Sequence, residues 1–175
     1  DEHVRRARPF IEAGLPVFVD KPLATNLADL NQFVRWHLDG RAILSTSGLR
    51  YAPEMRAVTQ QQDELGTLRW ITSLTCKTWE RYGIHALEAV YPLVGPGVTD
   101  VQTVAQPGSD LVCLRHRSGV QLTIAAIHDA VGSFGTVHVY GTKGQLPLRL
   151  TDTYTAFREQ LLAFVEFVRT GQRPF

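Results

Sequence analysis

Residues 12–24 read EAGLPVFVDKPLA, and this stretch decides the fold. Its apolar run at 15–19 does not alternate between polar and apolar residues, which is typical of a strand buried on both faces of a parallel sheet. A helical pattern precedes it and ends at Gly14, and a second helical pattern at 27–38 leads to another apolar run at 42–47. The first fifty residues therefore predict the order helix, strand, helix, strand of a doubly wound α/β sheet.

The pattern changes after about residue 50. Residues 68–76 alternate between apolar and polar side chains, which predicts a strand with one covered face. Helical patterns are present at 84–94 and 157–168, and the second one closes the chain. Four further strands are expected in pairs around two glycine-containing turns: 110–117, 120–128, 135–140 and 145–150. The second part is therefore expected to be an antiparallel α+β layer with helices on one face.

The composition excludes several classes of protein. The chain has 175 residues, of which 44% are hydrophobic and 20% charged, and this is too apolar for a disordered chain. A formal net charge of +1 argues against a nucleic-acid partner. No apolar run approaches the ~18 residues that span a membrane, and the N-terminus lacks the apolar segment of a signal peptide. Cys76 and Cys113 form no CxxC pair, so we expect two buried, reduced thiols and a cytoplasmic protein.

The first apolar strand ends at Asp20-Lys21-Pro22, and in open α/β sheets ligands bind at this carboxyl edge. A lysine there can direct its ammonium group at a carbonyl, a hydroxyl or a cofactor ribose, and partial desolvation makes it able to transfer a proton. Pro22 fixes the turn and is a candidate for a cis peptide bond. The alternative is an ordinary strand-to-helix turn with a solvated lysine.

His85 and Glu88 lie three residues apart and therefore share one face of the helix expected at 84–94. Together they are a candidate acid-base or hydrogen-bonding pair. The alternative is a structural histidine on an amphipathic helix. The other histidines show no metal-ligand spacing, so no metal site is expected.

Two groups combine arginine with aromatic residues. Arg50 and Tyr51 follow the second apolar strand, again at the ligand-binding edge, whereas Trp79, Arg81 and Tyr82 precede the helix that carries the histidine. Arginine beside aromatic rings is typical of a site for a sugar or a carboxylate, and it is equally common in ordinary packing. The residues alone leave both interpretations open.

Three segments resemble the Gfo/Idh/MocA oxidoreductases, the family of glucose-fructose oxidoreductase and inositol dehydrogenase. Residues 12–24 resemble the family's Glu-Lys-Pro segment, residues 83–95 (GIHALEAVYPLVG) resemble the helix with its active-site histidine, and residues 141–146 (GTKGQL) resemble its late hairpin. The resemblance implies the C-terminal remnant of a Rossmann domain over residues 1–50. Over residues 51–175 it implies an open-faced antiparallel sheet domain, closed by a helix, for substrate binding and oligomerisation.

The resemblance also implies a function. It implies NAD or NADP as the cofactor, and hydride transfer to or from a sugar, a polyol or a related hydroxy compound. Lys21 matches the family lysine that meets the nicotinamide ribose and the substrate, and His85 matches the histidine of proton transfer, which makes both candidate catalytic residues. The remaining candidates are cofactor contacts at Asp20, Lys21, Pro22 and Arg50, and substrate contacts at Trp79, Arg81, Tyr82 and Glu88.

This sequence departs from the family pattern in two ways. Family members usually carry Asp four residues before the histidine, where this chain has Arg81, and Glu88 is the candidate to take part instead. The chain begins at about the fifth Rossmann strand and contains no glycine-rich dinucleotide loop. We therefore expect the intact protein to be an NAD(P)-dependent enzyme, and the chain by itself to bind the cofactor weakly and to be inactive.

The departures keep two alternatives open. One is a non-catalytic binding or dimerisation module, and the other is NAD-assisted lyase or glycosidase chemistry on the same fold. A homo-oligomer is expected, because both faces of the strand at 120–128 are fairly apolar and the open face then needs a second covering surface. The family resemblance implies pairing through the same face. The alternative is a strand covered by the final helix of the same chain.

Overall fold

The computed structural model describes residues 2–129 and 135–175, which divide by their internal contacts into two units. The first unit contains the residues up to Ser47 together with Arg158–Phe175, and the second contains Gly48–Phe157. The expected closing helix is present as α6 (Thr153–Thr170), and most of it groups with the first unit. The predicted domains, 1–50 and 51–175, differ from the two units mainly in where this helix belongs.

The first unit has the predicted order of elements, α1 (His3–Glu12), β1 (Val17–Phe18), α2 (Leu27–Leu38) and β2 (Ile43–Leu44). The two strands are short and pair in parallel, as the continuous apolar runs predicted. The side chain of Asn26 accepts a hydrogen bond from the backbone N–H of Asp29 and so caps the start of α2. A small core forms around Ile11, Phe33 and Trp36.

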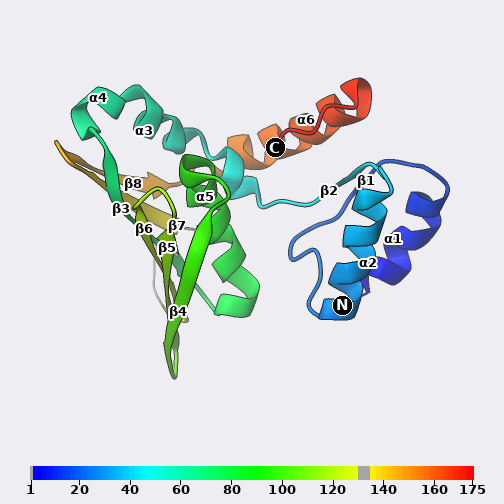
Figure 1. Ribbon diagram of the computed structural model, residues 1–175, viewed down its shortest axis with the longest axis horizontal. Coiled ribbons are helices and arrows are strands. Elements are labelled where there is room, and N and C mark those ends of the chain that lie inside the picture. The colour runs from blue at the N-terminus through cyan, green and yellow to red at the C-terminus, as the bar shows by residue number, and fades with distance from the viewer. Residues whose placement is uncertain (1, 130–134) are drawn as a thin grey trace. The chain divides into compact units, whose positions relative to one another are not determined.

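The second unit is built on a six-stranded sheet with helices on one face (Figure 1). Its strands are β3 (Leu68–Cys76), β4 (Val98–Gln106), β5 (Ser109–His116), β6 (Gln121–Ile127), β7 (Gly135–Gly141) and β8 (Gln145–Leu150). Its helices and turns are η1 (Gly48–Tyr51), η2 (Pro53–Met55), α3 (Arg56–Gln60), α4 (Gln62–Leu65), η3 (Trp79–Gly83) and α5 (Ile84–Val94).

The sheet is mixed, which corrects the expectation of an antiparallel layer. The strand order is β4-β5-β6-β3-β7-β8, so β3 lies between two strands that come much later in the sequence. β3 runs parallel to β6 and antiparallel to β7, while every other neighbouring pair is antiparallel. Both predicted hairpins are confirmed, since β5 pairs with β6 around Gly119 and β7 pairs with β8 around residues 141–144.

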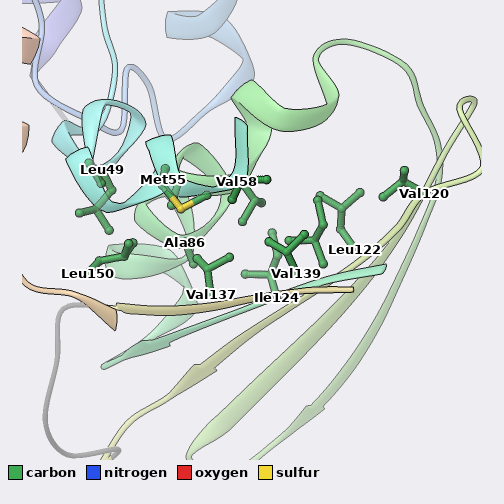
Figure 2. Packing of buried hydrophobic residues seen from close by; sticks show 14 of the residues in the cluster. Leu49, Met55, Val58, Ala86, Val120, Leu122, Ile124, Val137, Val139 and Leu150 are labelled. Carbon is green, nitrogen blue, oxygen red and sulfur yellow. The ribbon is translucent and has the colours of Figure 1, made fainter. Parts of the chain in front are cut away.

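The core of the second unit lies between the helices and one face of the sheet. Alternate residues of the strands point to this face, and Figure 2 shows those of β6 and β7 directed at side chains of η1, η2, α3 and α5. Ile124 and Val139 are fully buried from the sheet side, and Ala86 is 1% exposed from α5. This packing fixes α5, and with it the candidate histidine, against the sheet.

The structure corrects the expectations for one strand and for the cysteines, and it also bears on membrane spanning. Strand β4 was not predicted, because nearly all of its side chains are exposed and its pattern is not periodic. Both cysteines are free, but neither is buried, since Cys113 is exposed and Cys76 is half-buried. In the part of the chain that the structure describes, no helix is long and apolar enough to cross a membrane.

Candidate functional site

The Asp20-Lys21-Pro22 segment lies at the carboxyl end of a parallel strand, as predicted. The backbone N–H of Val19 donates to the carbonyl of Leu44 at 2.9 Å, which extends the pairing of β1 with β2 up to this segment. Asp20 is exposed and Lys21 is half-buried. The Lys21–Pro22 peptide bond is cis, which confirms Pro22 as a site for this bond. All three residues belong to the first unit.

His85 lies in the first turn of α5 and is 3% exposed. The ring of Tyr82 lies next to it, with the two ring centroids 5.2 Å apart and the planes tilted by 57°. Tyr82, three residues before the histidine, lies in a π-helical turn, η3, that directly precedes α5. Such turns are rare and occur often at functional sites.

Gly83 allows this turn to close. A Cβ atom at Gly83 would lie 2.6 Å from the ring of Trp79, so only glycine lets the indole pack over the backbone. Trp79 in turn packs against the core of the second unit. The candidate residue Trp79 therefore supports the η3 turn, and its predicted contact with substrate stays a prediction.

Arg50 and Glu88 form an ion pair that the sequence analysis missed. Arg50 Nε lies 3.4 Å from Glu88 Oε2, and the two side chains are only 9% and 17% exposed. The Arg50 guanidinium also lies over the ring of Tyr91, 5.5 Å from its centroid. Burial raises the pKa of the neighbouring Tyr51, an effect that Arg50 opposes and Glu88 increases. The candidate residues Arg50 and Glu88 are thus held close together inside the second unit.

A further residue, Lys77, was not among the predicted candidates. Its Nζ donates a hydrogen bond to the Tyr82 hydroxyl at 2.7 Å and lies 4.4 Å from the centroid of the Tyr82 ring. Arg81, on the same turn as Tyr82, is exposed. No sequence pattern marks Lys77, because its contact depends on the conformation of the turn.

The structure thus gathers Trp79, Tyr82, His85, Glu88 and Arg50 in the second unit, on η1, η3 and α5. Elements η1 and α5 pack directly against each other, which explains why Arg50 reaches this helix. Within residues 2–129 and 135–175, no group of three or more His, Cys, Asp and Glu side chains is arranged to hold a metal ion.

Comparisons with known proteins place this fold among dehydrogenase structures. GenD2 from gentamicin A biosynthesis, in complex with NAD, matches with a TM-score of 0.84 and 18% sequence identity, covering 99% of this chain and 67% of that chain. A putative myo-inositol dehydrogenase from Sinorhizobium meliloti matches with a TM-score of 0.82 and 16% identity, covering 99% and 69%. A probable dehydrogenase from Thermotoga maritima matches with a TM-score of 0.83 and 17% identity, again covering 99% and 69%.

These matches define the fold of the chain. It is the fold of these dehydrogenase structures over nearly the whole of this chain and about two thirds of theirs. It agrees with the fold expected from the three sequence segments, a Rossmann remnant followed by an open-faced sheet. No protein-family model and no curated protein matches the sequence.

Proposed function

We propose that the chain supplies the substrate-binding and proton-transfer part of an NAD(P)-dependent oxidoreductase that acts on a sugar, a polyol or a related hydroxy compound. The observation that carries the proposal is the agreement in fold, over 99% of the chain, with GenD2 in complex with NAD and with a putative myo-inositol dehydrogenase. The positions of Lys21 and His85 support it, since each lies on the element that the family resemblance implies.

The residues present suit one end of a dinucleotide. Lys21 at the carboxyl end of β1 offers an ammonium group to a ribose hydroxyl, and Asp20, Pro22 and Arg50 are the other proposed contacts. A pyrophosphate needs the backbone N–H groups of a glycine-rich turn, and this sequence has no such turn between a strand and a helix. When bound, NAD or NADP supplies the hydride acceptor or donor.

Two side chains of this protein handle the proton and the reacting oxygen. Lys21 donates a hydrogen bond to the oxygen of the reacting carbinol or carbonyl group and polarises it. His85 accepts the proton of the hydroxyl group during oxidation and returns it during reduction. Glu88 is engaged with Arg50, so its proposed part is to keep this arginine and the face of α5 in place.

We also propose that two copies of the chain pair through the open face of the sheet. The outward side chains of β6, namely Thr123, Ala125 and Ile127, are only half-buried, and Trp70 on β3 is 42% exposed. A groove of about 490 Å³ crosses this face over β3, β6, β7 and β8. A largely apolar, grooved sheet face of this kind suits a two-fold interface.

We also propose a cytoplasmic location, which the two free cysteines support.

The test of the enzymatic proposal is reduction of NAD or NADP by inositols and aldoses, followed by absorbance, in the protein that carries this chain. Lys21→Ala and His85→Gln are each expected to lower kcat by about 10²–10⁴-fold. His37→Gln, at an exposed histidine of α2, is the matched control and should leave turnover unchanged. Unchanged turnover in both candidate variants would reject the catalytic roles, whereas no turnover of the unmodified protein with any of these substrates would favour the non-catalytic module.

A further inference from the structure

Lys77 adopts a backbone conformation that lysine rarely takes. Its φ is +63°, and it is the one non-glycine residue with positive φ in the ranges that the structure describes. The left-handed conformation is unfavourable for an L-residue with a side chain, and such residues are concentrated at functional sites. The conformation turns the chain sharply after β3 and brings the Lys77 ammonium group back onto Tyr82.

Tyr82 connects this ammonium group to His85. The same ring that lies beneath Lys77 Nζ is the ring in contact with the imidazole. Lys77 uses one of the three N–H donors of its ammonium group for the phenol oxygen of Tyr82. The ammonium group also retains two further N–H donors.

The turn between β3 and α5 carries two cationic side chains, Lys77 and Arg81, and one carboxylate, Glu80. Lys77 contacts a neutral phenol, and the exposed Arg81 forms no ion pair with a carboxylate in the described part of the chain. The carboxylate of the same turn, Glu80, is held by its own backbone N–H and by Thr78, which lower its pKa. Arg50, by contrast, is already matched by Glu88. Among the described residues, Lys77, just before η3, and Arg81, within η3, are therefore two cations without a carboxylate partner on the turn that leads into the helix of His85.

We infer that Lys77 and Arg81 form an anion-binding element beside His85, and that the substrate is a polyhydroxy compound carrying a carboxylate or a phosphate. The inference rests on the proposed function, since His85 marks where the reacting carbon lies. Lys77 and Arg81 bind the anionic group.

Calorimetric titration of the full chain with three probes tests this inference. The probes are D-glucuronate, D-glucose 6-phosphate and D-glucose, at matched ionic strength, so that the first two distinguish a carboxylate from a phosphate. At least one anionic probe is expected to bind about tenfold or more tightly than glucose. Raising the salt concentration should reduce the difference.

The decisive variant is Lys77→Gly. It removes the ammonium group but suits the left-handed backbone, so the fold should be at least as stable as before. The preference for the anionic probe is expected to fall about tenfold in Lys77→Gly, to fall in Arg81→Gln, and to persist in Lys77→Arg. Lys143→Gln, at an exposed lysine of the β7–β8 hairpin, is the control and should retain it.

Three results would overturn the inference. These are equal binding of all three probes, no binding of any of them, and an anion preference that survives both Lys77→Gly and Arg81→Gln. The proposed function is tested separately, because reduction of NAD or NADP by a neutral polyol with dependence on His85 would uphold it even when the anion preference is absent.

Discussion

The two faces of the six-stranded sheet are made by the same strands but have different tasks. On the covered face, Ile71, Ile124 and Val139 are fully buried beneath the helices. On the open face, Trp70 is 42% and Leu111 38% exposed, and Trp70, Tyr140 and His138 form a row of stacked rings. The covered face holds the helix with the candidate histidine, and the open face is left for a partner. Four mutational experiments test how far this difference holds.

The largest effect is expected at the covered face of β6. Ile124→Ala removes a fully buried side chain from between the sheet and the helices and should lower the free energy of unfolding by about 3 kcal/mol. Ile127→Ala, on the open face of the same strand, should cost less than about 1 kcal/mol. Urea unfolding measures both, and equal losses would show that the two faces are packed alike.

A comparable contrast is expected between the two ends of β7, whose terminal glycines are both on the covered face. A Cβ atom at Gly141 would lie 2.0 Å from the backbone oxygen of Leu65, whereas at Gly135 the nearest atom would be 3.5 Å away. Gly141→Ala should therefore destabilise the fold by about 2 kcal/mol or more, and Gly135→Ala by much less. Thermal melts of the two variants check this, and a similar change in Tm would contradict it.

A smaller effect is expected at Glu54, which anchors the covering layer to the end of β8. Its Oε1 accepts hydrogen bonds from the backbone N–H groups of Thr151 at 2.7 Å and Asp152 at 2.8 Å. Burial raises the pKa of Glu54, but these hydrogen bonds outweigh burial and leave the pKa below its ordinary value. The charged carboxylate therefore stabilises the fold.

A lowered pKa fixes the sign of the pH dependence. The stabilisation by Glu54 is present above the ordinary glutamate pKa of 4.5 and is lost as the pH falls through the lower pKa of the folded state. Glu54→Gln should cost about 1 kcal/mol at neutral pH and make the acid limb of the stability curve shallower. Glu64→Gln, at an exposed glutamate of α4, is the control. Parallel acid limbs in Glu54→Gln and the unmodified protein would refute this role.

The smallest effect on folding, and a large effect on assembly, is expected from Ile127→Asp. This side chain is on the open face, so the free energy of unfolding of the monomer should change by less than about 1 kcal/mol. A buried charge at a two-fold interface occurs twice, so self-association should weaken strongly. Light scattering at micromolar concentration measures the mass. A dimer unaffected by the change would exclude this face, and a monomeric unmodified protein would exclude the dimer.

Local patterns predicted much of the fold. The continuous apolar runs predicted the parallel strands β1 and β2, and alternation predicted β3 and the two hairpins, because the side-chain period of a strand is set by its backbone. Glycine in the turn between β5 and β6 predicted its position, since Gly119 has a φ of +87° that other residues rarely adopt. Strand β4 escaped prediction because an edge strand with two exposed faces has no hydrophobic period.

The sequence by itself determined the candidate motifs and the strand periods, since both depend on residues that are neighbours along the chain. Which face of β3 is covered was decided by the tertiary structure, because Ile71, Ser73 and Thr75 are buried while Trp70, in the apolar set of the alternation, is exposed. Only the tertiary structure decided that β3 pairs with β6 and β7 and that Arg50 meets Glu88. The same is true of Lys77, which reaches Tyr82 through a left-handed turn. These contacts depend on which distant segments bury the most apolar surface together, and that balance is a property of the whole chain rather than of any local pattern.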